Sequence, residues 1–306
     1  MSILVLGSIN TDLVVASSHL PRPGETVIGG SFDQFHGGKG ANQAVAAARL
    51  ARCPVTFVGC IGDDSFGRDS LAHLREENLD CRFIKTVAGV PSGVALILVD
   101  ADAENAISVA SGANFALTPS DIDLIPGEVF DQADVMLASL EIPIETVARS
   151  LERAKDHDVT TIVNPAPANV DLLERCMDKI DILTPNEGEL HKLSGQPVDD
   201  GSAMIAAARQ LLKQGCRKLI VTIGSRGAIV VDAEDALHIP ANRVQAVDTT
   251  AAGDAFNGAL AVQLVESVTL SEAVRWANQV AAISVTRAGA QSSLPTRDEV
   301  EQAVSQ

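Results

Sequence analysis

The sequence predicts an α/β fold in which helices cover both faces of a mostly parallel sheet. From Val135 onward, short apolar runs alternate with longer segments of helical character. Strands separated by helices of this length pair in parallel and need a helix layer on each face. The first apolar run, Ile3–Leu6, has no polar position, as expected of a strand buried on both faces. With 306 residues and 46% hydrophobic content, the chain suits one large domain.

The predicted elements of this domain follow in chain order. The strands are Ile3–Leu6, Val55–Gly59, Val135–Leu140, Thr160–Asn164, Ile180–Thr184, Lys218–Ile223 and Gly227–Asp232, the last with a neighbour across a turn at Asp235 and Ala236. The helices are residues 41–51, Asp69–Asn78, Pro143–Asp156, Val170–Met177, Glu187–Ser194, Ala203–Gln214 and Ser271–Ala288, with one more that opens within Asp248–Gly258 and continues to Val265.

Two segments do not fit this alternation. Leu13–Phe35 contains two prolines and three glycines between short apolar strips, which is too turn-rich for a helix. Gly93–Val99 and Ala106–Ser108 resemble strands of the same type, with a turn at Ala101–Glu104. From the residues alone, these segments predict irregular β structure outside the main core.

Composition excludes several classes of protein. The formal net charge of −17 argues against nucleic acid or anionic membranes as partners, because neither attracts an acidic surface. No apolar run approaches the ~20 residues that span a bilayer. The N-terminus enters a strand directly, so we expect no signal peptide. Five cysteines without C-x-x-C spacing predict reduced core thiols in a cytoplasmic protein.

The stretch Asp248–Gly258, DTTAAGDAFNG, predicts a turn that opens a helix. Ala251, Ala252 and Gly253 have almost no side chain, so a ligand can approach their backbone. The first amides of a helix lack intrahelical partners and carry partial positive charge, which predicts a phosphate site. Asp254 lies in the same turn, where a carboxylate needs a task such as accepting a proton. The alternative is that the polar residues only cap the helix.

A second glycine-led helix start occurs at His36–Asn42, HGGKGAN. Its glycines expose backbone around the side chains of Lys39 and Asn42. Two such starts, far apart in sequence and both containing polar groups, are hard to explain by capping alone. Asn10 and Asp12 follow the first strand at its carboxyl end, where ligands of open α/β sheets bind. An Asx turn is the alternative for this pair.

Other nucleotide-binding and hydrolase motifs are missing from the sequence. There is no G-x-x-x-x-G-K-[ST] P-loop and no G-x-G-x-x-G after the first strand. There is also no H-R-D or D-F-G set and no G-x-S-x-G elbow. These absences remove the main competing enzyme classes.

Together the two helix starts, GGKGANQAVAAARL and DTTAAGDAFNGALA, resemble the signatures of the PfkB family of carbohydrate kinases, also called the ribokinase family. NPAPA at Asn164–Ala168 and TPNEGE at Thr184–Glu189 extend the resemblance over nearly the whole chain. It implies a three-layer sandwich with a central, mostly parallel sheet. It also implies a small β lid, from about residues 11–36 and 90–110, that covers the sugar and joins two copies in a homodimer.

The resemblance implies ATP-dependent phosphorylation of D-ribose at its 5-hydroxyl. Asp254 would be the base, and the amides of Ala251, Ala252, Gly253 and Asp254 would form the anion hole. We expect the helix N-terminus to lower the pKa of Asp254 and so keep it ionised. The matching sugar-binding residues are Asn10, Asp12, Gly38, Lys39, Gly40, Asn42, Glu141 and Asp254. The alternatives for Lys39 and Glu141 are a surface lysine and a solvated surface acid.

The resemblance also implies a nucleotide site and two kinds of metal ion. The matching nucleotide-binding residues are Asn186, Thr222, Gly224, Ser225, Gly227, Gly253 and Asn278. Asn186 and Glu189 would organise Mg²⁺ through water and phosphates, although both could instead cap a helix. An activating K⁺ would lie beside the anion hole, within reach of Asp248, Thr250, Ser284, Arg287, Gly289 and Ser293, mostly through backbone carbonyls.

Two kinds of alternative remain open. Within the family, the substrate could be deoxyribose, fructose or adenosine instead of ribose. One tryptophan and no tyrosine leave little aromatic surface for a nucleobase, although eight phenylalanines remain. Outside the enzymes, the chain could be a non-catalytic sugar-binding relative. The intact Asp254 and its turn argue against this, because a binder needs no base there.

Overall fold

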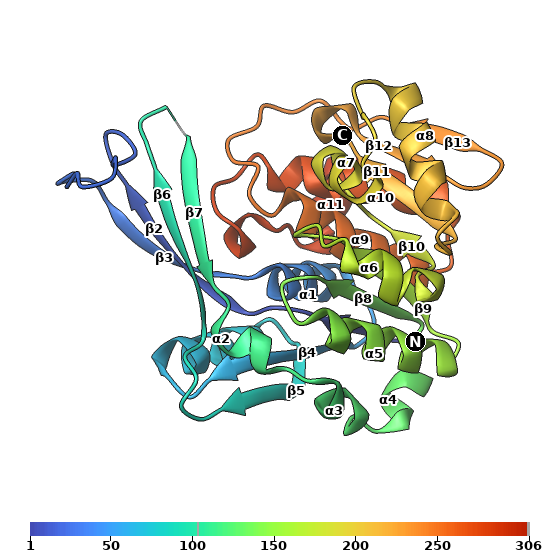
Figure 1. The fold of residues 1–306 in the computed structure, drawn as a ribbon, viewed down its shortest axis with the longest axis horizontal. Helices are drawn as coiled ribbons and strands as arrows, with labels where there is room; N and C mark the ends of the chain where they lie inside the picture. The colour runs from blue at the N-terminus through green and yellow to red at the C-terminus, as the bar shows by residue number, and fades with distance from the viewer. Residues whose placement is uncertain (103, 305–306) are drawn as a thin grey trace.

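A computed structural model describes residues 1–102 and 104–304. These described residues form two sheets, a nine-stranded sheet in the body and a four-stranded sheet that projects from it (Figure 1). The order in the large sheet is β13-β12-β11-β10-β9-β8-β1-β4-β5. Its strands are β1 Ile3–Leu6, β4 Val55–Gly62, β5 Asp80–Val87, β8 Val135–Ser139, β9 Thr160–Asn164, β10 Ile182–Leu183, β11 Lys218–Thr222, β12 Ala228–Val231 and β13 Ala236–Ile239.

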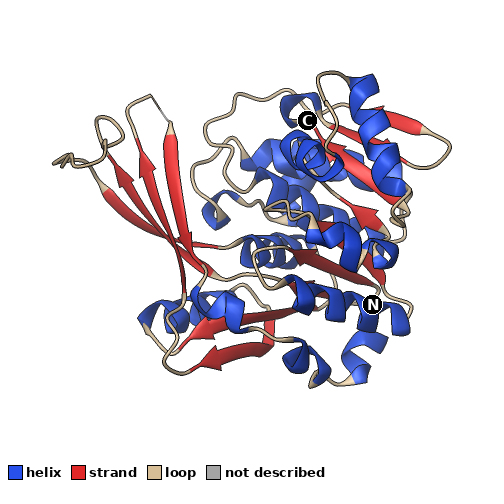
Figure 2. Cartoon of the chain, in the orientation of Figure 1, coloured by secondary structure: helices blue, strands red, loops and turns tan. Residues whose placement is uncertain are grey.

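The large sheet is parallel from β11 to β5 and antiparallel at β12 and β13. Alternate residues of β1 belong to different cores, Leu4 and Leu6 to one and Ile3 and Val5 to the other. This period-two pattern means that both faces of the sheet are buried. The predicted three-layer α/β architecture is confirmed (Figure 2).

Helices cover each face of the large sheet. One layer contains α3 Pro119–Asp123, α4 Gly127–Asp131, α5 Ile144–Asp156, α6 Asp171–Arg175, α7 Glu187–Ser194 and α8 Gly201–Leu212. The other contains α1 Lys39–Leu50, α2 Ser65–Glu76, α9 Ala252–Val265, α10 Leu270–Ser284 and α11 Arg297–Val304. The described residues also include four short 3-10 turns: η1 Gly112–Ala116, η2 Met177–Lys179, η3 Gly224–Arg226 and η4 Gln291–Ser293.

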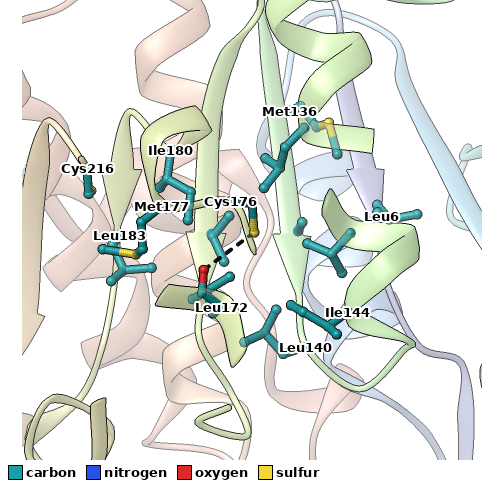
Figure 3. Close-up of a cluster of buried hydrophobic side chains, with 14 of the residues drawn as sticks. Leu6, Met136, Leu140, Ile144, Leu172, Cys176, Met177, Ile180, Leu183 and Cys216 are labelled. Carbon is teal, nitrogen blue, oxygen red and sulfur yellow. Dashed lines mark hydrogen bonds between the residues drawn. The ribbon is translucent and has the colours of Figure 1, made fainter. Parts of the chain in front are cut away.

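The core on the α5–α8 side is apolar and contains three cysteines, Cys60, Cys176 and Cys216. Figure 3 shows Cys176 and Cys216 among leucine, isoleucine and methionine side chains, and the Cys176 thiol donates to the carbonyl of Leu172 at 3.8 Å. Burial raises the pKa of both thiols to about 12. All five cysteines are free, so they act here as small apolar side chains.

The small sheet has the order β3-β2-β6-β7 and consists of β2 Asn10–Ala16, β3 Phe32–Gly37, β6 Gly93–Val99 and β7 Asn105–Ala110. The small sheet is therefore formed by the two segments that do not fit the α/β alternation. These segments were expected to be irregular β structure, and they form regular strands. The predicted turn at Ala101–Glu104 includes residue 103, which lies outside the described residues. β2 follows β1 almost directly and β3 runs into α1, so this sheet joins the body beside the first strand (Figure 1).

Two close backbone approaches place the helices that carry the glycine-led motifs. A Cβ on Gly40, in the first turn of α1, would lie 2.4 Å from the carbonyl carbon of Gly7 at the end of β1. A Cβ on Gly258 in α9 would lie 2.6 Å from the Cβ of Ala46 and 2.8 Å from the backbone oxygen of Gln43. Both distances are too short for a side chain, so glycine lets α1 sit directly against β1 and α9.

Several elements differ from the expected ones. Helix α2 begins at Ser65, four residues before the predicted Asp69, because Asp64 caps it by accepting from the amide of Gly67 at 2.8 Å. The predicted helix Ser271–Ala288 already ends at Ser284. The predicted strand Ile180–Thr184 retains only two residues in β10, Ile182 and Leu183. No element was predicted for β5, α3, α4 or α11.

Among the residues that the structure describes, no helix combines the length and apolar character needed to cross a membrane.

Candidate functional site

The start of α9 has the geometry of an anion site. Ala251, the residue before the helix, is left-handed at φ 57°, which turns the chain into the first helical turn. Within the described chain, the amides of Ala251, Gly253 and Asp254 have no hydrogen-bond acceptor, whereas that of Ala252 donates to Thr249 at 3.3 Å. A Cβ on Gly253 would meet no atom within 4 Å. Of the four amides expected in the anion hole, three are thus unpaired among the described residues, and that of Ala252 is engaged within the turn.

Asp254 is buried at this turn and held by two amides from α1. Its side chain is 5% exposed. Asn42 donates from Nδ2 to Oδ2 of Asp254, and Gln43 donates from Nε2 to Oδ1, each at 3.0 Å. The Asn42 amide is itself oriented, because its Oδ1 accepts from Nε2 of Gln291 at 3.1 Å. Each carboxylate oxygen therefore has its own donor from the facing helix.

The expected direction of the Asp254 pKa is wrong. Burial raises the pKa of this carboxyl more than its charged and hydrogen-bonding neighbours lower it. The opposing influences are the ammonium of Lys39, then the amides of Asn42 and Gln43. The same charge pairing raises the pKa of Lys39, with Glu141 and Glu189 adding to the effect of Asp254. Lys39 is therefore a cation held among carboxylates, not a plain surface lysine.

Glu141 is tied to both the first strand and the first helix. Its Oε2 accepts from the hydroxyl of Ser8 at 2.5 Å and from the amide of Lys39 at 3.1 Å. Ser8 follows β1 and is fully buried, and its Oγ lies 3.4 Å from the amide of Gly40, which donates to it. The carboxyl end of β8 and the start of α1 are thereby joined at one carboxylate, which makes Glu141 part of the site.

Asn10 and Asp12 reach the same region from the base of the small sheet. Asn114 in η1 donates from Nδ2 to Oδ1 of Asn10 at 2.8 Å, and it also pairs with the backbone of Ile9. With its oxygen so engaged, Asn10 keeps its own NH₂ group available as a donor. Burial, followed by the charges of Glu141 and Asp254, raises the pKa of Asp12 from 3.8 to about 6. These two residues form ladder positions of β2 instead of an Asx turn.

Replacing Asp12 with asparagine should stabilise the ligand-free protein at neutral pH. Between 3.8 and about 6 the native state binds more protons than the unfolded chain, so the free energy of unfolding falls as the pH rises. At 1.36 kcal/mol per pKa unit, the fall is about 3 kcal/mol. An uncharged asparagine side chain at this position avoids it. Urea unfolding should therefore show Asp12→Asn as the more stable protein well above pH 6, with the difference vanishing below the ordinary aspartate pKa.

The control for this measurement is Asp33→Asn, an exposed aspartate on β3 of the same small sheet. This variant removes the charge of an exposed side chain, so no buried charge is lost. Its free energy of unfolding should therefore follow that of the wild type at every pH. If Asp12→Asn raised the free energy of unfolding by the same amount at every pH, the burial of the ionised Asp12 carboxylate could not be the cause.

Five of the seven predicted nucleotide residues lie at the carboxyl ends of β10 and β11, and Gly253 lies in the first turn of α9. Asn186 and Thr222 form a parallel bridge, and the amide of Thr222 donates to the carbonyl of Pro185 at 3.0 Å. Gly224 and Ser225 form η3 directly after β11, followed by Gly227 at φ 100°. Asn278 lies elsewhere, on α10, where its Nδ2 donates to the carbonyls of Ile239 at 3.1 Å and Pro240 at 3.4 Å. Its amide nitrogen thus fixes the chain after β13.

Asn186 and Glu189 form a capping box at the start of α7. Oδ1 of Asn186 accepts from the amide of Glu189 at 2.8 Å, and Oε2 of Glu189 accepts from the amide of Asn186 at 2.9 Å. Burial raises the pKa of Glu189, against the lowering influence of Lys39. The capping alternative is therefore realised, and Glu189 nonetheless lies within electrostatic reach of the Asp254 cluster.

The residues expected around a monovalent cation come from two adjacent loops. Asp248 accepts from the amide of Thr250 at 2.9 Å and from that of Gly289 at 2.8 Å. The carbonyl of Val285 accepts from Val247 and Asp248. The remaining side chains point to other partners: Arg287 pairs with Glu299 at 2.7 Å, while Ser284 and Ser293 donate to the carbonyls of Ala281 and Ala290. Any cation bound here would have to rely on backbone carbonyls and Asp248.

Four residues of the site were missed by sequence reasoning: Ser8, Gln43, Asn114 and Asn164. Gln43 and Asn164 lie inside the quoted motifs, and Ser8 lies in the polar turn after the first strand. The available signal for Gln43 is a polar amide in a helix otherwise made of small apolar residues. No comparable signal marks Asn114, whose partners Ile9 and Asn10 are about a hundred residues away in the chain.

Comparisons with known proteins agree with this arrangement. The model described as pfkB family carbohydrate kinase matches residues 1–297. The chain is 41% identical over 298 residues to a ribokinase from Haemophilus influenzae, covering 97% of this chain and 96% of that one. It is 39% identical over 307 residues to a deoxyribokinase from Salmonella typhi, covering 100% and 99%.

Among solved structures, the ribokinase of Arabidopsis thaliana complexed with ribose and ATP matches with a TM-score of 0.89 at 32% identity. The match covers 98% of this chain and 97% of that one. The resemblance carried by the two helix-start motifs is confirmed, as is the predicted fold class.

Proposed function

Because the chain belongs to the pfkB family of carbohydrate kinases, we propose that it phosphorylates D-ribose at the 5-hydroxyl, using ATP and giving D-ribose 5-phosphate. The observation that carries this proposal is the buried carboxylate of Asp254. It lies in the first turn of α9, beside three amides that lack acceptors within the described chain and under the influence of the Lys39 ammonium. A base, an anion site and a cation are thereby combined at one helix start.

The chemistry follows from these groups. Asp254 accepts a hydrogen bond from the 5-hydroxyl, orients it toward the terminal phosphorus of ATP and finally takes its proton. The P–O bond to the new sugar oxygen forms as the bond to ADP breaks. The unpaired amides of α9 stabilise the negative charge on the transferred group. A raised pKa makes Asp254 a stronger base than an exposed aspartate.

Sugar binding is assigned to the polar groups that converge from β2, from the start of α1 and from the carboxyl end of β8. Asn10, Asp12, Lys39, Asn42 and Glu141 offer both donors and acceptors, which vicinal hydroxyl groups require. Buried polar groups left unpaired reject an analogue that lacks a hydroxyl. The second candidate substrate is 2-deoxyribose, because a deoxyribokinase is 39% identical over the whole chain.

Mg²⁺ fits the charge balance of this site. The carboxylates of Asp12, Glu141, Glu189 and Asp254 interact with one another or with the single ammonium of Lys39. Mg²⁺ generally keeps several waters and is held by few carboxylates plus phosphate oxygens. Glu189 and Asn186 would hold it through those waters. Bound with ATP, it would supply neutralisation of phosphate charge.

A K⁺ ion would fit beside α9, where Asp248 and the carbonyl-rich turn after Val285 meet the start of the helix. Replacing K⁺ with Na⁺ should lower kcat/KM by about tenfold, a change of about 1.4 kcal/mol, because the smaller ion would pull these carbonyls out of position. The measurement is ADP release at constant ionic strength in either salt. Equal rates in the two salts would remove K⁺ from the proposal.

The small sheet is proposed to act as a lid over the sugar and as the contact of a homodimer. Exposed apolar side chains on its strands support the second role. Phe32 is 62% exposed, Leu96 55%, Ile107 57% and Val109 48%. Apolar area of this kind on a projecting sheet is typical of an interface. The five free thiols suit a reducing compartment, so we also propose that the protein is cytoplasmic.

The experiment that tests the function is coupled ADP release with Mg-ATP and K⁺ over D-ribose, 2-deoxyribose, fructose and adenosine. Selective turnover of ribose supports the proposal. Preferred turnover of another member leaves the mechanism in place and replaces the substrate. Ribose binding in a thermal-shift assay without any ADP release would instead favour a non-catalytic sugar-binding protein.

A further inference from the structure

A closed loop of buried hydrogen bonds passes through Asp254. Gln43 donates from Nε2 to Asp254 at 3.0 Å and to Oδ1 of Asn164 at 3.1 Å. Asn164 donates to the carbonyl of Thr184 at 3.1 Å. The Thr184 hydroxyl donates to Oδ1 of Asn257 at 2.6 Å, and Nδ2 of Asn257 donates to the carbonyl of Gly253 at 2.8 Å. Gly253 precedes Asp254, so the loop closes; we call it the Asp254 ring.

Two backbone carbonyls fix the direction of every bond in the ring. The carbonyl of Thr184 can only accept, so Asn164 must face it with its NH₂ group and must turn its oxygen toward Gln43. Gln43 must then present its NH₂ group to both Asn164 and Asp254. In the same way the carbonyl of Gly253 requires the NH₂ group of Asn257, and the oxygen of Asn257 requires the proton of Thr184. The orientation of each amide is thus determined by its partners.

Burial disfavours any other orientation of these amides. Gln43 is 0% exposed, Thr184 and Asn257 are each 1% exposed, and Asn164 is 7% exposed. Oε1 of Gln43 is buried without a partner among the described residues. Even so, turning the amide over would place that oxygen against the oxygens of Asn164 and Asp254. An unmade hydrogen bond inside the protein is costly, so the ring has one low-energy state.

We infer that Gln43 is a positioning residue for phosphoryl transfer, and that the ring it belongs to holds the Asp254 carboxylate in register with the amides of α9. The inference rests on the proposed kinase function. It accounts for two motif residues, Asn164 and Thr184, to which the family resemblance gave no role. Their side chains link the ends of β9 and β10 to the first turn of α9, and Gln43 adds the facing helix α1.

The first test compares Gln43→Met with Gln263→Met. Gln263 lies on α9, is 9% exposed and donates to Glu266, so it loses a similar side chain away from the ring. Gln43→Met should lower kcat by about tenfold to a hundredfold, the range for a hydrogen bond to a charged group, while KM for the sugar changes little. Gln263→Met should keep the wild-type kcat. Equal kcat in Gln43→Met and Gln263→Met overturns the inference.

A second pair covers the case in which Gln43→Met fails to fold. Thr184→Val keeps the shape of the side chain and removes the proton that Asn257 needs, whereas Thr184→Ser keeps the hydroxyl. We expect a lower kcat in Thr184→Val and its recovery in Thr184→Ser. A loss that follows side-chain volume instead of the hydroxyl would contradict a role for the ring.

A readout independent of turnover separates this inference from the proposed function. The Asp254 carboxyl can be followed by ¹³C NMR, with its signal assigned by its loss in Asp254→Asn. Removing the Gln43 donor should move the midpoint of its titration to higher pH, against the background of Lys39, Glu141, Asp12 and Glu189, which remain. An inactive wild type with this shift defeats the kinase proposal and retains only the structural part of the inference, that the ring holds the Asp254 carboxylate. An active wild type without the shift defeats only the ring.

Discussion

Asp254→Asn should lower kcat by about 10²- to 10⁴-fold, the range for a positioned acid–base group, with little change in ribose affinity. The asparagine is nearly isosteric and can still accept from Asn42 or Gln43 through its oxygen. It cannot take the proton of the 5-hydroxyl. It also no longer contributes the negative charge that pairs with Lys39. The loss therefore belongs to the chemical step more than to sugar binding.

The measurement is steady-state ADP release together with calorimetric titration of ribose. Asp156→Asn, at the exposed end of α5, makes the same chemical change away from the site and should behave as wild type. A variant at Asp254 with wild-type kcat would remove it as the base. A variant with lost ribose binding and unchanged kcat would make it a sugar ligand only.

Gly40→Ala should lower the free energy of unfolding by about 1–3 kcal/mol, the usual cost of forcing extra volume into a packed interior. The new methyl would lie 2.4 Å from the carbonyl carbon of Gly7 and 2.5 Å from the amide nitrogen of Ser8. These are backbone atoms and cannot rotate away. Helix α1 must therefore shift from β1, and Lys39, Asn42 and Gln43 shift with it. We expect a weaker affinity for ribose along with the loss in stability.

The control is Gly201→Ala, in the first turn of α8, where an added methyl meets no atom within 4 Å. Alanine is favoured over glycine in helices, so this variant should be as stable as the wild type or slightly more so. Chemical denaturation followed by circular dichroism compares the two. Equal stabilities in the two glycine variants would show that α1 can move away from β1 without lowering the free energy of unfolding, and would contradict this prediction.

The sequence predicted the buried strands better than the edges of the fold. Strands such as β1 and β9 are almost wholly buried, and their bounds match the prediction. β5 was missed because it is an edge strand, where Asp80, Arg82 and Lys85 interrupt the apolar pattern. α11 was missed because only Val300 of its described side chains is fully buried in the core, so its helical periodicity is weak.

The candidate site divides in the same physical way. Glycine-led helix starts are local patterns, so Lys39, Asn42 and Asp254 could be selected from the chain directly. The bond from Gln43 to Asp254 spans 211 residues and exists only because Gly258 lets α1 and α9 touch. The pKa of Asp254 was predicted in the wrong direction for a related reason. A helix terminus is visible in the sequence, whereas the burial that outweighs it arises from packing.

Asn10 and Asp12 are two positions apart on β2, yet they differ in how they are attached to the body of the protein. Asn10 is tethered through Asn114 to η1, which packs beside β4 of the body. Asp12 lies beyond that tether, where β2 pairs with β3 and β6 of the small sheet. Bending of the sheet about its base would carry Asp12 toward or away from Asp254 and leave Asn10 in place. Of these two proposed sugar ligands, Asn10 is tied to the body through Asn114 and Asp12 is carried by the small sheet. A second copy of the chain or a crosslink could restrain the small sheet in one position. The apparent sugar affinity would then change by the free energy that this restraint contributes.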